Sequence, residues 1–270
     1  EILNFAFMAF CDEKHPAIFA DITYGFYPVF AKINRLPYEI IPLKNDFSID
    51  YKDYLSKGKN IVIANPNAPT GLAISLADVE RIVSANENRV VVVDEAYVDF
   101  GGESAVALTK KYKNLLVCQT YSKSRGMAGA RLGFAIGDAA LIADLELIKY
   151  STNPYNLDRL TLAAGVAALS DDSRRYYAEK QAELMATRER ATAALIALGA
   201  EVIPSLANFI FVKLPSIDGA ELNAKLRERG ILVRHFKSER IKDHNRISIG
   251  TPEEMSTLVC EIEKIIGERK

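Results

Sequence analysis

The residues best suited to chemistry in this sequence stand directly behind short apolar runs. Asp94 follows four consecutive valines. Lys123 lies between two serines in a glycine-rich segment, 120–131, that ends on Arg131. Together these groups suit a pyridine-ring aldehyde phosphate. The acid keeps the ring nitrogen protonated, the amine forms a Schiff base with the aldehyde, and hydroxyls with a guanidinium hold the phosphate.

Each polar segment has a simpler interpretation when it is taken alone. The segment 65–71, Asn-Pro-Asn-Ala-Pro-Thr-Gly, has the composition of an ordinary rigid turn. Asp94 fits a helix cap or a structural ion pair, and a charge this close to a buried strand is expected to need a cationic partner. Most lysines are merely solvated, so Lys123 gains weight only from its neighbours. The chemical interpretation therefore rests on the three segments together.

The elements that must position these segments alternate between apolar strands and helices. Strands are predicted at 61–64, 90–93, 115–118 and 132–136. A helix is predicted over 75–88, with Ser75 as its N-cap and Asp78 where the helix dipole favours an acid. Such strands are typical of a mostly parallel sheet sandwiched by helices, so the predicted fold class is α/β. Ligands bind beyond the carboxyl ends of these strands, which is where the polar segments stand.

The second half of the chain has a different pattern. It predicts one long helix or two close ones over 171–198, a strand at 208–212, a helix at 220–229, strands at 231–234 and 246–249, and a closing helix from about 252. This is a smaller α+β domain. We therefore expect a large cofactor-binding domain over 1–175 and a small C-terminal domain over 176–270.

Composition excludes several classes of protein. Lys and Arg number 34 and Asp and Glu 35, so the net charge of −1 speaks against a general nucleic-acid binder or a basic membrane-surface protein. No apolar run approaches the roughly 20 residues that cross a bilayer. The three cysteines and three histidines form no disulfide framework and no zinc pattern. A reduced, cytoplasmic protein without a metal is expected.

Five motifs together make the chain similar to a known family. They are NPNAPTG (65–71), VDEAY (93–97), TYSKSRGMAGARLGF (120–134), GILVRHF (230–236) and RISIGTPEEM (246–255). The chain resembles fold-type I pyridoxal-phosphate aminotransferases over nearly its whole length, and most closely the histidinol-phosphate branch. The resemblance implies an aspartate-aminotransferase-like large domain, a homodimer, and transamination between L-histidinol phosphate and 2-oxoglutarate in histidine biosynthesis.

The resemblance also implies roles for individual residues around the cofactor. Lys123 corresponds to the Schiff-base lysine, which also moves the proton between substrate and cofactor. Asp94 pairs with the pyridine nitrogen, and Tyr97 bonds the phenolic oxygen of the ring. Tyr24 corresponds to the aromatic residue that stacks on the ring.

Anion-binding roles follow from the same comparison. Thr120, Ser122 and Arg131 correspond to the residues that hold the cofactor phosphate. Arg246 corresponds to the arginine that takes the substrate carboxylate, and Arg234 to one that helps hold the substrate phosphate. Ala68 stands where many relatives have an asparagine that contacts the phenolic oxygen. By this comparison either Asn67 substitutes for it or Tyr97 acts alone.

Several alternatives stay open at this point. An aromatic or other class I/II aminotransferase, or a threonine-phosphate decarboxylase, shares the same cofactor residues. A barrel aldolase is disfavoured by the α+β second half, and a dinucleotide-dependent dehydrogenase by the lack of a G-x-G-x-x-G behind a strand. The resemblance implies that the family's N-terminal segment, which helps to hold the phosphate, is missing. A folded fragment without cofactor is therefore the remaining alternative.

Overall fold

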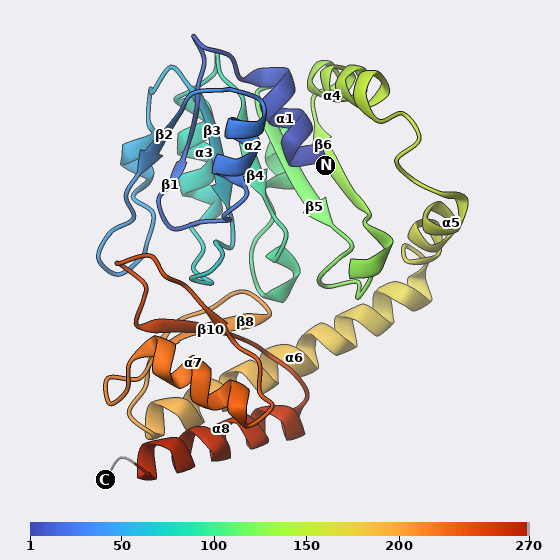
Figure 1. The fold of residues 1–270 in the computed structure, drawn as a ribbon. Coiled ribbons are helices and arrows are strands. Elements are labelled where there is room, and N and C mark those ends of the chain that lie inside the picture. Colours follow the sequence, from blue (N-terminus) through green and yellow to red (C-terminus); the bar gives the residue numbers. More distant parts are fainter. Residues whose placement is uncertain (269–270) are drawn as a thin grey trace.

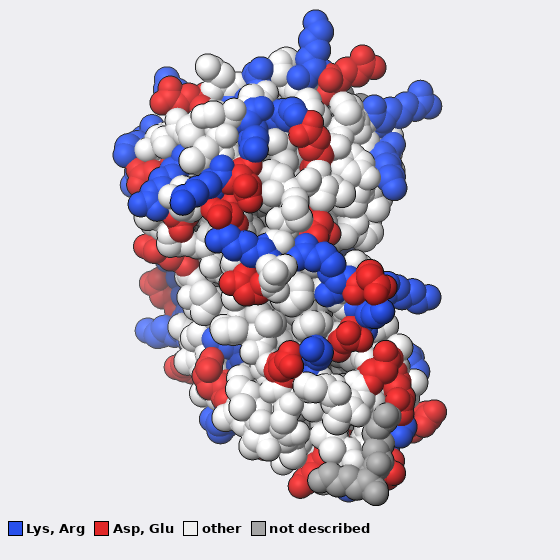
Figure 2. Space-filling view, turned by 90° about the vertical axis from the view of Figure 1, so that its left-hand side faces the viewer, with Lys and Arg blue, Asp and Glu red and all other residues white. Residues whose placement is uncertain are grey.

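The computed structural model describes residues 1–268 and divides them into two lobes, each built on its own β-sheet (Figure 1). The larger sheet has six strands in the order β2-β1-β3-β4-β5-β6, and the smaller has four in the order β7-β8-β10-β9. No helix among the described residues is long and apolar enough to cross a membrane. On the face drawn in Figure 2, acidic and basic side chains are interspersed, as expected from the near-zero net charge.

The larger sheet is parallel except at one edge. Its strands are β1 (Ala17–Ala20), β2 (Tyr38–Ile41), β3 (Asn60–Ala64), β4 (Val91–Asp94), β5 (Leu115–Thr120) and β6 (Gly133–Gly137). The first five run parallel, and β6 pairs antiparallel with β5. Every residue of β3 and β4 is buried, because helices cover both faces of the sheet.

Alternate residues of the central strands pack on opposite helical layers. One face packs against α1 (Ile2–Phe10), α2 (Tyr27–Ile33) and α4 (Ala139–Thr152). The other face packs against η1 (Tyr51–Tyr54), α3 (Leu76–Ser84) and η3 (Ala105–Lys110). The short helices η2 (Val98–Phe100) and η4 (Ala128–Ala130) and the helix α5 (Arg159–Ala167) complete this lobe. A sheet covered in this way has only its strand ends free to form a site.

Two helix predictions can be followed to their caps. Ser75 is the N-cap of α3 and accepts a hydrogen bond from the backbone N–H of Asp78, as predicted, although the helix ends at Ser84 rather than at residue 88. The segment 171–198 forms one helix, α6 (Asp171–Ala197), which is followed by Gly199 in a left-handed conformation. The domain boundary expected at 175 and 176 falls inside α6.

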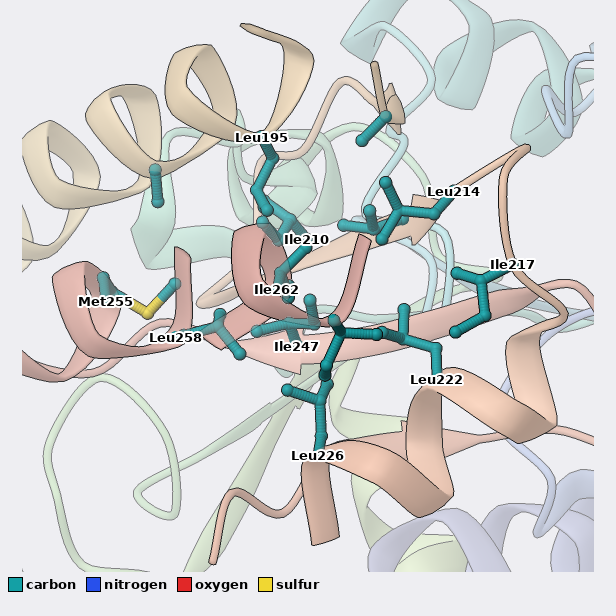
Figure 3. Packing of buried hydrophobic residues seen from close by; sticks show 14 of the residues in the cluster. Leu195, Ile210, Leu214, Ile217, Leu222, Leu226, Ile247, Met255, Leu258 and Ile262 are labelled. Atoms are coloured by element: carbon teal, nitrogen blue, oxygen red, sulfur yellow. The ribbon is translucent and has the colours of Figure 1, made fainter. Parts of the chain in front are cut away.

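The smaller lobe has an antiparallel sheet covered by three helices. Its elements are β7 (Glu201–Ile203), β8 (Phe209–Lys213), α7 (Gly219–Glu228), β9 (Arg234–His235), β10 (His244–Ser248) and α8 (Pro252–Gly267). Figure 3 shows its core, in which Leu195 of α6, Ile210 and Ile247 of the sheet, Leu222 of α7 and Ile262 of α8 meet. The other apolar face of β8 packs on the larger lobe, where Phe211 meets Phe47 and Phe209 meets Tyr97.

One predicted strand is wrong. The segment 231–234 contributes only Arg234 to a strand, and β9 has just two residues in register with β10. Ile231 and Val233 pack on the core from an irregular segment, so their apolar character reflects packing rather than strand geometry. The chain leaves α7 through Gly230 at φ +76°, and only then reaches the sheet edge.

The two lobes are joined by polar contacts as well as by apolar packing. Arg188 of α6 is buried and donates to the carbonyls of Phe100 and Ala207. Arg240 of the smaller lobe pairs with Asp21 behind β1. These contacts hold the smaller lobe against the carboxyl-end edge of the larger sheet.

Candidate active site

A cavity of about 280 Å³ opens at the carboxyl ends of β3, β4 and β5. This is close to the lower end of the roughly 300–1,000 Å³ usual for small-molecule sites. Eight of the residues discussed in the sequence analysis line this cavity: Tyr24, Ala68, Asp94, Tyr97, Thr120, Ser122, Lys123 and Arg131. Parallel strands end at the same edge of the sheet, which brings together residues that are far apart in the sequence.

Asp94 is a nearly buried carboxylate at the end of β4, with 7% of its surface exposed. One of its oxygens accepts a hydrogen bond from the Tyr27 hydroxyl at 2.8 Å, and the other accepts from the backbone N–H of Ala96 at 3.1 Å. Burial raises the pKa of Asp94, while these bonds and the charge of Lys123 act in the opposite direction. The two hydrogen bonds to Asp94 come from neutral donors, and Lys123, a cationic partner of the kind expected from the sequence, acts on the carboxylate through its charge.

Lys123 lies across the cavity in the turn that follows β5. Its side chain is exposed in the open cavity, and Nζ stands 5.4 Å from the centre of the Tyr97 ring. Desolvation of the amine is the main cause that lowers the pKa of Lys123, and the charges of Arg246 and Arg131 add to it. The charge of Asp94 opposes this effect. These surroundings thus increase the fraction of neutral amine, which is the form that acts as a nucleophile or a base.

Hydroxyls and a guanidinium gather beside this lysine. Thr120 and Ser122 both line the cavity, and the Thr120 hydroxyl accepts from the backbone N–H of Ser122 at 3.1 Å. Arg131 also lines it, and is anchored by a 2.8 Å bond from its guanidinium to the Ala128 carbonyl. Its backbone has φ 56°, a conformation that is costly for a side chain other than glycine and is often found at functional sites.

Two tyrosines, one exposed and one buried, stand near the cavity, Tyr24 in the segment between β1 and α2 and Tyr27 at the start of α2. Tyr24 lines the cavity with 41% of its surface exposed, and its ring meets the Tyr27 ring edge-on at 5.6 Å. Tyr27 is fully buried. The sequence analysis selected Tyr24 and missed Tyr27, because nothing in the local motif distinguishes the tyrosine that bonds Asp94.

Asn67 lies beside the cavity without lining it. Its amide oxygen accepts from the Thr23 hydroxyl at 2.8 Å, and its amide nitrogen donates to the Ile22 carbonyl at 2.9 Å. These bonds tie the turn 65–71 to the segment that carries Tyr24. Ala68, its neighbour, does line the cavity. With Asn67 engaged in this way, Tyr97 is the better placed partner for a ring oxygen.

The two arginines predicted to bind the substrate are not among the residues that line the cavity. The Arg246 guanidinium stacks on Phe209 at 5.0 Å, and Phe209 meets the Tyr97 ring edge-on, also at 5.0 Å. The charge of Arg246 also contributes to the lowered pKa of Lys123. Arg234 is exposed, faces Arg246 across the β9–β10 ladder, and stacks on Phe236. Because the two arginines are partners in the ladder, they form a positive edge of the small sheet.

A buried network that the sequence analysis missed supports the cavity wall. The Glu95 carboxylate is buried and accepts from the Ser104 hydroxyl, the Ala105 backbone N–H and the Gln119 amide, at 2.6, 2.6 and 2.8 Å. Gln119 lines the cavity. A glutamate directly behind Asp94 and a glutamine before Thr120 were visible in the sequence, but only the fold shows that they meet.

The N-terminal residues of the chain close one side of the cavity. Glu1, Ile2 and Leu3 line it together with Asn156 and Leu157. The Glu1 carboxylate accepts hydrogen bonds from the side-chain amides of Asn153 and Asn156. These contacts bring the start of α1 against the segment between α4 and α5.

This arrangement fits a pyridine-ring aldehyde phosphate. Asp94 offers an anionic oxygen, Lys123 offers an amine, and Thr120, Ser122 and Arg131 offer donors, all in one cavity. Ala64, Ala68 and Ala96 also line it, and their small side chains leave room for a ring. An isolated carboxylate in this position is costly unless a positive group completes it, and a protonated ring nitrogen is such a group.

Comparison with known proteins gives a consistent result. A family model, aminotransferase class I and II, matches residues 1–262. Histidinol-phosphate aminotransferase 1 of Burkholderia pseudomallei (strain K96243) is 49% identical over 267 residues, which cover 99% of this chain and 74% of that protein. Histidinol-phosphate aminotransferase 2 of Dechloromonas aromatica (strain RCB) is 50% identical over 268 residues, covering 99% and 75%. The chain thus spans about three quarters of the length of these relatives.

Solved structures agree with this comparison at the level of the fold. Histidinol-phosphate aminotransferase from Sinorhizobium meliloti, solved in complex with pyridoxal-5'-phosphate, matches with a TM-score of 0.88 at 21% identity, covering 100% of this chain and 75% of that one. The aspartate aminotransferase of Thermus thermophilus, solved as a tetra mutant, matches with a TM-score of 0.84 at 19% identity, covering 98% and 77%. The predicted fold, a mostly parallel sheet sandwiched by helices as in aspartate aminotransferase, is confirmed.

Proposed function

Because the chain belongs to the class I and II aminotransferase family, we propose that it transfers the amino group of L-histidinol phosphate to 2-oxoglutarate, a step of histidine biosynthesis. The observation that carries this proposal is the meeting of Asp94 and Lys123 in one cavity, a carboxylate and an amine whose pKa values are both shifted by burial. Relatives almost half identical over the whole chain support the choice of substrate.

Pyridoxal phosphate is the cofactor that these residues would hold. Asp94 would keep the ring nitrogen protonated, and Tyr97 would donate to the phenolic oxygen. Thr120, Ser122 and Arg131 would bind the phosphate, because hydroxyls and a guanidinium together satisfy an anion with several oxygens. When bound, the cofactor supplies an electron sink for the bond that breaks at the substrate carbon. Tyr24 would cover the open face of the ring.

The proton transfer belongs to Lys123. A base must be neutral before it can accept a proton, and the lowered pKa of Lys123 increases the neutral fraction near pH 7. Its Nζ would take the proton from the substrate carbon that bears the amine and would then pass this proton to the cofactor. Arg131 and Arg246 disfavour an extra positive charge at Nζ, and so favour release of the proton.

The positive edge of the smaller lobe would bind the substrate anions. Arg246 and Arg234 face each other across two strands, so an anion between them relieves the repulsion of two like charges. The phosphate of histidinol phosphate and the carboxylates of 2-oxoglutarate are both anions that a planar guanidinium binds with two parallel hydrogen bonds. One site would thus serve the two substrates in turn.

A homodimer would cover the apolar surface beside the cavity. Leu147 and Tyr150 of α4, Tyr155 behind it, and Leu160 and Val166 of α5 are all more than half exposed. Figure 1 shows α4 and α5 along one side of the molecule, where α5 leads into α6. So many large apolar side chains on one stretch are typical of a protein interface. Sedimentation velocity should give the mass of a dimer, and a monomer at all concentrations would exclude this arrangement.

Absorbance spectroscopy tests the proposed function. The protein is mixed with pyridoxal phosphate, freed of excess, and titrated with L-histidinol phosphate or with phenylalanine. We expect a visible band from the bound cofactor that histidinol phosphate removes at far lower concentration than phenylalanine. A stronger response to phenylalanine would move the protein to the aromatic aminotransferases.

Variants of the smaller lobe sharpen this test. Arg234→Gln should raise KM for histidinol phosphate about 10-fold or more, since a charge-assisted hydrogen bond contributes roughly 1.5–3 kcal/mol. Lys237→Gln, which changes an exposed charge three residues further along, is the matched control and should leave KM unchanged. Equal effects of the two changes would show that only the general charge of this edge matters.

A further inference from the structure

We propose that Tyr27 is a positioning residue of the cofactor site, whose hydroxyl orients the Asp94 carboxylate and keeps it ionised without neutralising its charge. The inference rests on the proposed function, because it concerns the residue that would hold the ring nitrogen. Tyr27 does not line the cavity and would touch neither cofactor nor substrate. Its effect would be transmitted through Asp94.

Packing holds the Tyr27 hydroxyl in one place. Tyr27 begins α2, is fully buried, and has its ring 5.7 Å from that of Phe19 and 5.6 Å from that of Tyr24. The hydroxyl stands 2.8 Å from Oδ2 of Asp94. A ring enclosed in this way cannot turn aside at small cost, since protein interiors are close-packed. The carboxylate therefore receives a donor whose direction is set by the core.

The two neutral donors leave part of Asp94 free for the cavity. Tyr27 donates to Oδ2, and the Ala96 backbone N–H donates to Oδ1. An ionised carboxylate has about four lone-pair positions. Two remain, and Asp94 lines the cavity, so the free positions serve a donor that arrives there.

A neutral partner suits this task better than a cation. An arginine or lysine bonded to Asp94 would cancel the charge that a protonated ring needs, whereas a hydroxyl stabilises the carboxylate and leaves its negative charge in place. Burial, followed by the charge of Asp94, raises the pKa of Tyr27 well above its ordinary range, so the phenol remains a donor at every pH at which the enzyme works. Hydrogen bonding of Asp94 by two neutral donors is thus a feature of the site.

A second buried tyrosine provides the control. Tyr54 lies on the opposite face of the sheet with 1% of its surface exposed, and its hydroxyl has no hydrogen-bond partner among the described residues. Tyr27→Phe and Tyr54→Phe each remove one buried hydroxyl and keep the ring. The first change removes a bond to Asp94, and the second removes none. Any difference between them therefore belongs to the Asp94 contact.

The experiment compares these variants with the wild type, with and without cofactor. Tyr27→Phe should weaken binding of pyridoxal phosphate by about 10-fold or more, the effect of a hydrogen bond to a charged group. It should also shift the pH titration of the bound cofactor's visible band and lower kcat more than it changes KM. Tyr54→Phe should leave all three readouts unchanged. In an Asp94→Asn background, Tyr27→Phe should add little, because coupled residues are not additive.

A measurement without cofactor provides a second readout. Carbon-13 NMR titration of the aspartate carboxyls, with Asp94 assigned from the Asp94→Asn variant, should show a higher pKa for Asp94 in Tyr27→Phe than in the wild type. Removing the hydrogen bond from Tyr27 removes one of the effects that lower this pKa.

The outcomes separate the inference from the function on which it rests. If Tyr27→Phe matches Tyr54→Phe in cofactor affinity, in the pH titration and in the Asp94 pKa, Tyr27 only fills space, and the proposed aminotransferase function stands. If the wild type itself gives no cofactor band, the proposed function fails and this inference fails with it.

Discussion

The cavity and the core of the smaller lobe differ in the kind of side chain that they remove from water. In the core of the smaller lobe, hydrophobic side chains from α6, α7, α8 and the sheet pack together (Figure 3), and the buried amide of Asn245 donates to the Gly219 carbonyl at 2.8 Å. At the cavity, a carboxylate and an amine are crowded together, and both pKa values move in the direction that disfavours the charged form. Burial therefore stabilises the fold in the core of the smaller lobe, whereas burial of charged groups at the cavity reduces the stability of the fold.

This difference separates stability from chemistry. Burial of an aliphatic side chain contributes about 1.5–3 kcal/mol, so the smaller lobe can hold its sheet edge rigidly beside the cavity. A partly desolvated charge costs stability, but it also creates the reactive state that a cofactor or substrate completes. Substitutions in the two regions should therefore have separable effects.

Lys123→Ala is the change with the largest expected effect. Loss of the amine removes the base and the covalent attachment, so turnover should fall by at least about 10⁴-fold. The fold and binding of pyridoxal phosphate should persist, because the change removes a side chain exposed in the open cavity. Steady-state kinetics and equilibrium dialysis measure the two effects. Turnover close to that of the wild type would remove Lys123 from the mechanism.

Ile262→Ala tests the other side of the comparison. Ile262 is fully buried in the core of the smaller lobe, so the cavity left behind should cost about 2–5 kcal/mol of unfolding free energy. Ile196→Ala, at a half-exposed position of α6, is the control and should cost much less. Urea unfolding measures both. The pH titration of the bound cofactor should stay unchanged, and a shift equal to that of an active-site variant would contradict the separation.

Asp94→Asn should have the smallest effect of the three changes, and it should stabilise the fold, whereas Ile262→Ala should destabilise it. Because the folded-state pKa of Asp94 is raised, the protonated carboxyl stabilises the fold at low pH, and this contribution is lost as the pH rises from the ordinary value of 3.8 through the folded-state pKa. Near pH 7 the cofactor-free variant, which carries no charge, should therefore melt above the wild type. Each kcal/mol corresponds to roughly 2–4 °C in a chain of this size.

Calorimetry of the cofactor-free proteins across pH checks this sign. The advantage of Asp94→Asn should shrink as the pH falls toward that ordinary value, where the wild-type carboxyl is also neutral. Cofactor affinity should fall at the same time. A wild type that is the more stable protein near pH 7 would mean that Tyr27 and Ala96 offset the full cost of burying this charge.

Local patterns were sufficient for most of the elements that the sequence analysis predicted, but they gave no prediction for β1, β2, α4 or α5 and did not reveal all contacts. The valines before Asp94 predicted a buried strand, and Ser75 predicted a helix start, because both signals lie within a few residues of the element they define. The strand predicted at 231–234 is wrong, because its apolar residues pack on the core from an irregular segment. For the ring oxygen the sequence leaves Asn67 and Tyr97 as alternatives, and no local motif reveals that the Asn67 amide bonds Thr23 and Ile22.

By itself the sequence determined the fold class, the strand ends that carry polar residues, and the family, because periodicity and motifs are properties of short segments. Only the tertiary structure decided how those segments meet. The bond from Tyr27 to Asp94 spans 67 positions in the chain, and the stack of Arg246 on Phe209 joins the smaller lobe to the ring of Tyr97. Partners of this kind depend on which strands become neighbours and which side chains are enclosed, and those are consequences of packing the whole chain.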